Sequence, residues 1–223
     1  VIMQIKEVIC QQDKAREVLH KLEAVDPACI LAGGGPRNWF LGKVANDLDF
    51  YVWLYETEAH TALRFKRLGL DVKLVDFASD AWKDYGLMKY LFRIYEGEYR
   101  GEKIQVMCMK VNTFNSVVNH FGVSVCKFWW KGGKVMPTNE ALVSLINKTL
   151  YIADDYTAKE SHVKKMVGYF PEFKIDKLSE VGNAYEGLIS TTMEEYLNFH
   201  YHTHYNKKLL GLLPKGSYNK ECV

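Results

Sequence analysis

The spacing of hydrophobic and polar residues predicts a chain in which helices and strands alternate. Apolar side chains that recur every three or four positions are typical of amphipathic helices, because such positions share one helix face. In the N-terminal segment Ile9, Val18, Leu19 and Leu22 follow this spacing. The same spacing predicts helices over Ile5–Ala24, Glu56–Leu68, Asn112–Phe121, Glu140–Leu150 and Thr157–Tyr169.

Short apolar or alternating segments predict strands, because side chains on a strand point alternately to its two faces. Such segments cover Cys29–Ala32, Asp47–Leu54, Asp71–Phe77, Tyr90–Tyr99, Lys103–Val111 and Val123–Trp130. The fourth and fifth would form a hairpin across Gly101. We therefore predict an α/β (α+β) fold, with a mixed sheet flanked by helices over residues 1–137. A mainly helical C-terminal region would follow over residues 138–223.

Asp47 and Asp49 begin one of these strands, and their spacing places both carboxylates on the same strand face. Two carboxylates held side by side repel each other unless a cation lies between them. Mg²⁺ takes oxygen ligands and usually binds one or two carboxylates together with substrate phosphates. The pair therefore predicts a site for Mg²⁺, or for Mn²⁺, which prefers the same ligands.

A glycine turn precedes this strand. Gly33, Gly34 and Gly35 allow a ligand to approach the backbone closely, and Pro36 suits the first turn of a helix. Backbone N–H groups at such a turn can hold phosphates. The dinucleotide-binding G-x-G-x-x-G and the Walker A loop are both absent. A glycine turn or an Asp-x-Asp pair alone is usually structural, but together between two predicted strands they indicate phosphoryl or nucleotidyl transfer.

This segment resembles the head of the DNA polymerase β-like nucleotidyltransferase superfamily, most closely that of CCA-adding enzymes and poly(A) polymerases. The family motif runs Gly-Gly-x-x-Arg-Asp, a Leu-rich turn, Gly, a short loop and Asp-x-Asp. A weaker similarity to small nucleotidyltransferase-like proteins of phages and large DNA viruses continues through 114–134. The matching residues are Gly33, Gly34, Arg37, Leu41, Gly42, Asp47 and Asp49.

The resemblance implies an Mg²⁺-dependent (or Mn²⁺-dependent) enzyme that moves a nucleotide from an NTP such as ATP to an acceptor hydroxyl. Asp47 and Asp49 would be the catalytic and metal-binding residues. The expected acceptor is an RNA 3′ end such as that of tRNA. A protein or small-molecule hydroxyl stays open, because the chain is short for the helical body with which CCA-adding enzymes hold tRNA. Nucleotide contacts would come from Gly33, Gly34, Arg37 and Lys43.

Two positions depart from the family pattern. Asn38 replaces the aspartate that follows the arginine, and an amide can still form hydrogen bonds in the turn. The family also has a third carboxylate on a later strand, where this chain has Gln105 and Met107. Three explanations stay open. Either a neighbouring carboxylate replaces it, or a single metal suffices, or the chain is a catalytically impaired protein that binds a nucleotide or a partner. Neighbouring carboxylates that we considered are Glu98, Glu102 and Asp76.

Lysines and aromatic residues interleave in the segment 127–134. Lys127, Trp129 and Lys131 could stack on a base or contact the phosphates of an acceptor. A strand with one buried tryptophan and with lysines on the following turn is the simpler interpretation.

His162 lies in a lysine-rich predicted helix that could contact an RNA backbone or a base. The resemblance to phage proteins implies that this helix packs near the nucleotide, whereas a solvated helix face is the commoner outcome for such a charge run. His200, His202 and His204 would share a face if extended, but a polar tail explains them more simply than a metal site does.

Composition narrows the class of protein. A net charge of +2 gives no strongly basic surface field, and 48% hydrophobic residues suffice for a core. Five scattered cysteines without a C-x-x-C pair favour a reducing compartment over disulfides or zinc. We find no signal peptide and no apolar run of about 20 residues, so the sequence does not indicate a membrane partner. We therefore expect a cytoplasmic protein, in the host cytoplasm if a phage encodes it, and the sequence does not define its oligomeric state.

Overall fold

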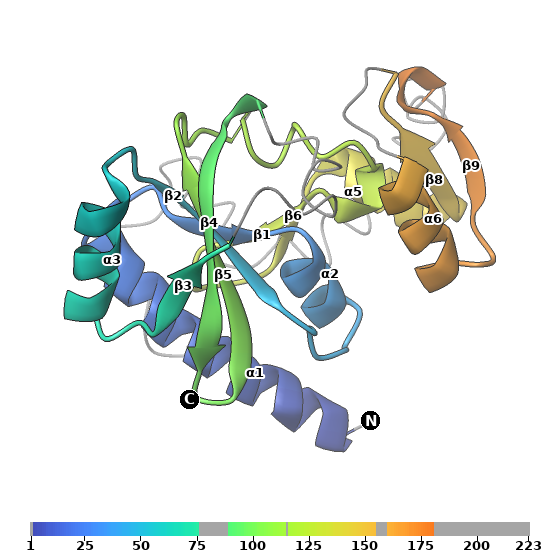
Figure 1. The fold of residues 1–223 in the computed structure, drawn as a ribbon. Helices are drawn as coiled ribbons and strands as arrows, with labels where there is room; N and C mark the ends of the chain where they lie inside the picture. The colour runs from blue at the N-terminus through green and yellow to red at the C-terminus, as the bar shows by residue number, and fades with distance from the viewer. Residues whose placement is uncertain (1, 76–88, 115, 155–159, 181–223) are drawn as a thin grey trace, which may run out of the picture. The chain divides into compact units, whose positions relative to one another are not determined.

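The backbone of the computed structural model alternates helices and strands, as the hydrophobic pattern predicts (Figure 1). The structure describes residues 2–75, 89–114, 116–154 and 160–180. Residues Val1–Ser179 form one compact unit. Its elements are α1 (Ile2–Glu23), β1 (Ile30–Ala32), α2 (Gly34–Phe40), β2 (Leu48–Trp53), α3 (Glu58–Arg67), β3 (Val72–Leu74), β4 (Leu91–Tyr99), β5 (Glu102–Met109), the 3₁₀ turn η2 (Ser124–Cys126), β6 (Phe128–Trp130), β7 (Met136–Pro137), α5 (Asn139–Asn147), β8 (Thr149–Ile152), α6 (Glu160–Tyr169) and β9 (Lys174–Lys177).

Seven strands form one mixed sheet in the order β3-β4-β5-β2-β1-β6-β7. β2 and β5 pair in parallel, whereas the other neighbouring strands of this sheet pair antiparallel. The strands β8 and β9 form a separate parallel pair. The predicted mixed α/β fold with flanking helices is therefore confirmed.

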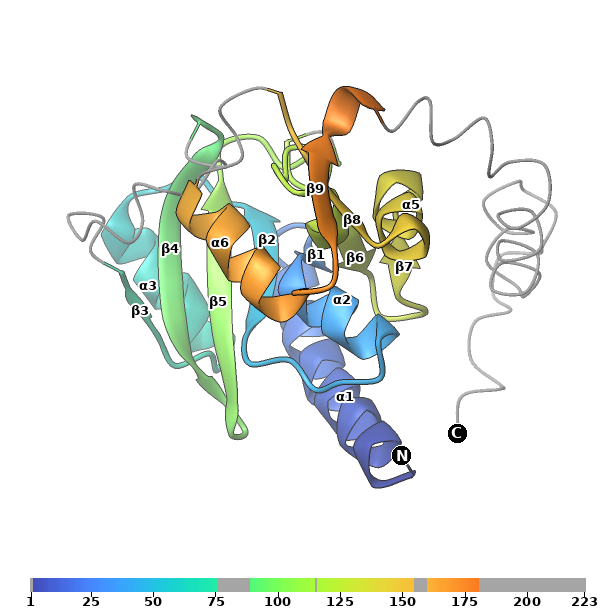
Figure 2. The same ribbon diagram turned by 90° about the vertical axis from the view of Figure 1, so that its right-hand side faces the viewer.

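The two faces of the sheet bury different groups of side chains. One face carries Phe50, Val52, Ile104 and Val106, which pack against apolar residues of α1 and α3. Figure 2 shows both helices behind the sheet, with α6 in front of it. The opposite face carries Tyr51, Met107 and Met109 together with residues 117–118. Alternation along β2 and β5 thus gives each strand two buried faces at its centre, as expected for central parallel strands. Within the described ranges, no helix has the length and apolar character to cross a membrane.

A tight hairpin turn sets the register between β4 and β5. Arg100 and Gly101 both have positive φ angles, 52° and 84°, as a two-residue type I′ turn requires. Tyr99 therefore pairs with Glu102, and counting back along the ladder places Glu96 opposite Gln105. The sequence predicted this hairpin, and the two-residue turn makes its register unambiguous.

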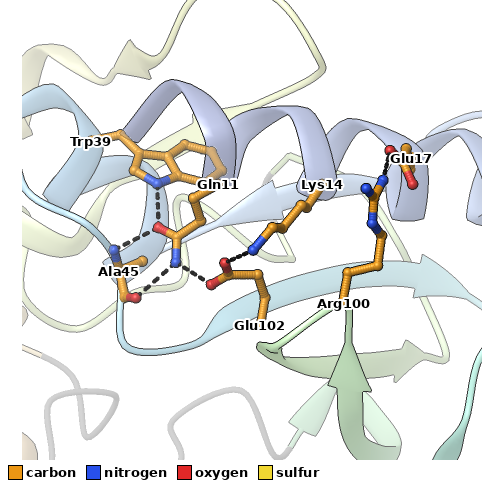
Figure 3. A network of polar contacts seen from close by, with 7 residues as sticks. All are labelled: Gln11, Lys14, Glu17, Trp39, Ala45, Arg100 and Glu102. Atoms are coloured by element: carbon orange, nitrogen blue, oxygen red, sulfur yellow. Dashed lines mark hydrogen bonds and ion pairs between the residues drawn. The ribbon is translucent and has the colours of Figure 1, made fainter. Parts of the chain in front are cut away.

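The amide of Gln11 connects helix α1 to the loop that leads into β2 (Figure 3). Its Oε1 accepts hydrogen bonds from Trp39 Nε1 and from the Ala45 backbone N–H, both at 2.7 Å. Its Nε2 donates to the Ala45 carbonyl at 2.9 Å and to Glu102 Oε2 at 2.7 Å. Lys14 Nζ binds the other oxygen of Glu102 at 2.6 Å. Gln11 is 5% exposed, so this fully bonded amide holds the loop next to both α1 and β5.

Four local predictions need correction. Residues 112–114 and 116–121 form turns instead of a helix, because Ser116 and Thr113 hydroxyls bond to nearby backbone groups. Before β6, residues 124–126 form a 3₁₀ turn instead of a strand. The helix predicted to Leu150 ends at Asn147, where Lys148 adopts a left-handed conformation. Among the described residues of the C-terminal region, the hydrophobic pattern did not predict β8 and the polar strand β9.

We expect Gln11→Met to lower the free energy of unfolding by about 2–4 kcal/mol, because it leaves buried donors and a carboxylate without their partner. Methionine keeps the size of the side chain, so packing loss contributes little. Urea denaturation followed by far-UV circular dichroism would measure the change. Asp13→Asn, on the exposed side of the same helix and paired with Arg16, should change stability by less than about 0.5 kcal/mol. Equal effects from both variants would contradict the role assigned to Gln11.

Candidate active site

Asp47 and Asp49 lie where the glycine turn meets the sheet. In the β1–β2 ladder Leu31 pairs with Phe50, so the next step places Ala32 beside Asp49 and the glycine turn directly after it. A Cβ atom added to Gly35 would lie 3.5 Å from the Asp47 carbonyl and 3.2 Å from Leu31 Cδ2. The antiparallel β1–β2 pairing thus brings the two halves of the predicted motif together.

Gly33, Gly34 and Gly35 have different structural roles in the turn. Gly33 has a φ angle of 90°, a conformation that L side chains rarely adopt. Its N–H donates to the Phe128 carbonyl at 2.8 Å, so it extends the sheet and does not face a ligand. We predicted phosphate contacts from both Gly33 and Gly34. Gly34 and Gly35 start helix α2, where N–H groups have no partner within the helix and are available to a ligand.

The carboxylate of Asp49 is held in an unfavourable environment for its charge. Burial and the charge of Asp47 are the main causes that raise the pKa of Asp49 to about 8. Lys165 and Lys103 lower it, and Glu96 adds a smaller increase. Without a further cation, this group holds its proton at neutral pH.

The environment of Asp49 fits a hard cation. Its Oδ1 is enclosed by the protein and has no hydrogen-bond donor among the described residues. A buried carboxylate oxygen normally has a partner, and a divalent ion would supply one while neutralising the repulsion from Asp47. The described part of the chain brings no group of three or more His, Cys, Asp or Glu residues together as metal ligands. The chain therefore offers Mg²⁺ two carboxylates, which leaves coordination positions for phosphates.

Arg37 brings a buried positive charge to the start of α2. Its side chain is 4% exposed. Asn38 Oδ1 accepts from Arg37 Nε at 3.3 Å and from Nη2 at 3.1 Å, so the amide fills the place of the family's aspartate. Arg37 Nη1 lies 3.7 Å from Cys126 Sγ and 3.2 Å from Met166 Sδ. These partners carry no formal charge, so the guanidinium keeps its capacity to attract an anion.

Helix α6 borders the site. Met166 contacts Arg37, and the rings of Tyr169 and Phe170 each lie 5.5 Å from the Arg37 guanidinium carbon. The charge of Lys165 acts on Asp49. Helix α6 therefore packs against Arg37 of α2, whereas its position near a nucleotide stays a prediction. The sequence interpretation did not single out Lys165.

Strand pairing brings a second carboxylate, Glu96, to Gln105 on the side opposite Asp49. Gln105 pairs with Asp49 on β2 and with Glu96 on β4, and Gln105 Nε2 donates a hydrogen bond to Glu96 Oε1. Glu102 lies on the opposite sheet face, bonded to α1. Glu98 is exposed, and Asp76 lies outside the described residues. Sequence analysis missed Glu96, although counting across the Arg100-Gly101 turn pairs it with Gln105.

Other residues proposed from the sequence are engaged elsewhere or lie at the border of the site. Lys127 is 3% exposed, and its Nζ lies 2.6 Å from Glu140 Oε2. Lys131 Nζ binds Glu23 at 2.7 Å and the Cys29 carbonyl at 2.6 Å.

Trp129 and His162 are half-buried, and Lys43 is exposed. The Trp129 ring packs edge-on against Phe114, with 5.7 Å between ring centroids. His162 Nε2 lies 3.5 Å from Cys126 Sγ. Burial and the charge of Lys165 lower the pKa of His162. His200, His202 and His204 lie outside the described residues.

Comparisons with known proteins give matches only among solved structures, since no family model and no curated protein matches the sequence. A Thermotoga maritima CCA-adding enzyme complexed with tRNA is 16% identical, with a TM-score of 0.46 over 78% of this chain and 42% of that chain. A CCA-adding enzyme complexed with ATP is 14% identical, with a TM-score of 0.49 over 86% of this chain and 47% of that chain. A tRNA-processing enzyme in an apo form is 13% identical, with a TM-score of 0.48 over 79% of this chain and 46% of that chain.

The chain spans less than half the length of each of these three proteins. At such low identity the likeness concerns the fold, so the chemistry of the site has to follow from its own residues.

We expect Asp49→Asn to stabilise the metal-free protein increasingly as the pH rises. The folded state holds the Asp49 proton up to about pH 8, whereas the unfolded chain releases it near pH 4. Stability is therefore greatest below the unfolded pKa and falls as the pH rises through the folded pKa. Asparagine carries no titrating carboxyl, so the variant does not lose this stability as the pH rises.

Urea denaturation in EDTA at about pH 5 and about pH 8 would test this, and the variant should gain about 1 kcal/mol or more relative to wild type between them. Asp13→Asn, an exposed carboxylate, serves as the matched control and should show no such trend. A gain of equal size at both pH values would contradict the environment assigned to Asp49.

Proposed function

We propose that this protein is an Mg²⁺-dependent nucleotidyltransferase that moves a nucleoside monophosphate from an NTP to an acceptor hydroxyl. The observation that carries the proposal is the enclosed Asp49 oxygen, which has no donor among the residues that the structure describes, next to Asp47 and beside the start of α2. Two half-buried carboxylates with one enclosed oxygen between them are suited to a divalent cation, and the adjacent N–H groups of Gly34 and Gly35 are suited to phosphate.

The residues have separate roles in this proposal. Asp47 and Asp49 hold the metal, which, when bound, neutralises the phosphates and polarises the reacting phosphorus–oxygen bonds. The N–H groups at the start of α2 receive phosphate oxygens. Arg37 supplies a positive charge from the same turn, where its printed hydrogen-bond partners among the described residues are neutral, and the charge of Lys165 on α6 also acts on Asp49. We retain Lys43, exposed on the loop between α2 and β2, as a nucleotide contact.

The reaction is a substitution at the α-phosphorus. The acceptor oxygen forms a bond to that phosphorus, and the bond from phosphorus to the oxygen bridging to the β-phosphate breaks. Pyrophosphate leaves with the electron pair of that bond, and the acceptor proton passes to a base. Fixed charges around the phosphates supply most of the rate enhancement in such reactions. The acceptor that we propose first is an RNA 3′ end, after the motif that the segment 31–52 resembles.

A second candidate function follows from Gln105. An amide stands opposite Asp49 on β5, where the motif resemblance implies a carboxylate. A protein that binds a nucleotide without transferring it would show this arrangement. The two candidates differ in one measurable property, the appearance of a covalently labelled acceptor.

The deciding experiment incubates the purified protein with Mg²⁺, each α-labelled NTP in turn, and total RNA or cell lysate. Label in the RNA, protein or small-molecule fraction identifies both nucleotide and acceptor. Asp47→Asn should reduce labelling by at least about 10³-fold, because one carboxylate cannot hold the metal against the phosphates. Asp13→Asn should leave it unchanged.

Labelling that persists in Asp47→Asn would contradict the assignment of Asp47 to the active site. No label in any fraction, with NTP binding still detected by calorimetry, would favour the nucleotide-binding protein.

We also expect Mg²⁺ to raise the thermal unfolding midpoint, with a larger increase at about pH 8 than at about pH 6. Metal binds the ionised carboxylate and has to displace the proton that Asp49 holds. Differential scanning fluorimetry with and without Mg²⁺ measures both effects. Asp49→Asn should abolish the shift, and an equal shift in that variant would show that Mg²⁺ binds elsewhere.

A further inference from the structure

Three side chains form a row across the sheet on the face that carries the candidate site. Asp49 on β2 pairs with Gln105 on β5, and Gln105 pairs with Glu96 on β4. Residues that pair directly across a ladder project to the same face of a sheet. Asp49, Gln105 and Glu96 are therefore neighbours on one face, in the order carboxylate, amide, carboxylate.

Gln105 draws the carboxylate of Glu96 toward the central strand. Strands in a sheet lie about 4.8 Å apart, so the Cα atoms of Asp49 and Glu96 are roughly 10 Å apart with β5 between them. The Gln105 amide donates to Glu96 Oε1. The ends of the two side chains therefore meet, which places the Glu96 carboxylate next to the Gln105 amide on a strand that itself has no carboxylate at this level.

The surroundings of Glu96 agree with an active role. Gln105 is 5% exposed and its hydrogen bond to Glu96 is partly buried, whereas Glu96 itself is half-buried and can meet a substrate. The charge of Glu96 acts on Asp49, which shows that the two carboxylates share one electrostatic environment. The described residues contain no cluster of three metal-ligating side chains. Proton transfer therefore suits Glu96 better than metal binding does.

We propose that Glu96 is a catalytic carboxylate that accepts the proton of the acceptor hydroxyl, and that Gln105 positions it. This inference rests on the proposed transfer reaction. As the acceptor oxygen bonds to the α-phosphorus, its O–H bond breaks and the proton passes to a Glu96 carboxylate oxygen. The phosphorus–oxygen bond to pyrophosphate breaks in the same substitution, so charge and atoms balance. Glu96 Oε1 stays bonded to Gln105, and Oε2 is the oxygen left for the proton.

The experiment compares Glu96→Gln with Glu98→Gln under single-turnover conditions. Both glutamates lie on β4 with side chains on the same face, but Glu98 pairs with Lys103 two residues further along the ladder. Glutamine at position 96 can still accept the hydrogen bond from Gln105, so we expect the fold to be kept. Each of the two variants removes one negative charge, so they are matched in charge. We expect Glu96→Gln to lower the transfer rate by about 10²–10⁴-fold. Nucleotide affinity by calorimetry should change by less than about threefold, and Glu98→Gln should leave the rate within about threefold.

Restoring a carboxylate on β5 separates a chemical role from a structural one. In the Glu96→Gln background, Gln105→Asp places a carboxylate over the same strand and should recover at least about tenfold in rate. The positioning role of Gln105 is tested by Gln105→Met alone, which keeps the size and removes the donor. It should lower kcat by about tenfold or more with KM little changed, because the carboxylate is present but no longer held in place.

The possible outcomes distinguish a failure of the role proposed for Glu96 from a failure of the proposed nucleotidyl transfer. Wild-type transfer that survives in Glu96→Gln would overturn the role of Glu96 while leaving the transferase intact. Equal losses in Glu96→Gln and Glu98→Gln would reduce the effect to net charge and would also overturn it. If wild type transfers no label to any acceptor, the proposed function fails first, and the role of Glu96 fails with it.

Discussion

The parallel pairing of β2 with β5 is the constraint on which the rest of the unit depends. β2 is central in the sheet, and its two neighbours run in opposite directions relative to it. The antiparallel neighbour β1 brings the glycine turn to the start of β2, and the parallel neighbour β5 brings Gln105 to the same level. A shift of one residue in either ladder would send Asp49 into the apolar face that α1 covers. Burial of the apolar side chains therefore fixes the register of both ladders, and this register determines the sheet face on which Asp49 lies.

Electrostatics oppose the arrangement that packing imposes. The fold holds Asp47 and Asp49 together, encloses one Asp49 oxygen for which the described part of the chain has no donor, and buries Arg37 beside two sulfur atoms. None of these features stabilises the protein in isolation. Strain of this kind is common where a protein is prepared for a ligand, because the ligand provides the missing opposite charges. Hydrophobic contacts on both faces of the sheet offset the unfavourable terms.

Sequence alone predicted the elements that have a strong period or a clear turn signal. The amphipathic α1, the Asp-x-Asp strand and the hairpin around Gly101 all follow from spacing and from turn-forming residues. It failed where side chains bond to the backbone locally, as Ser116 does, and where the polar strand β9 pairs without apolar alternation.

The candidate site was predictable only in part, for the same reason. Asp47, Asp49 and the glycine turn are close in sequence, so their meeting could be inferred from strand geometry. Lys165 reaches the site from α6, and no local pattern encodes that approach. The burial of Lys127 against Glu140 is likewise a tertiary event, which the interleaved lysines and aromatics did not reveal.

The amide of Gln11 imitates a peptide group. Its N–H and C=O pair with the carbonyl and N–H of Ala45, as a residue of an adjacent strand would. The loop before Asp47 therefore has a strand-like partner that comes from a helix side chain. Deamidation to glutamate would exchange one atom and turn the donor into an acceptor that faces the Ala45 carbonyl and Glu102. Deamidation of this single amide would thus repel the loop that positions Asp47 and Asp49, although neither aspartate is itself changed.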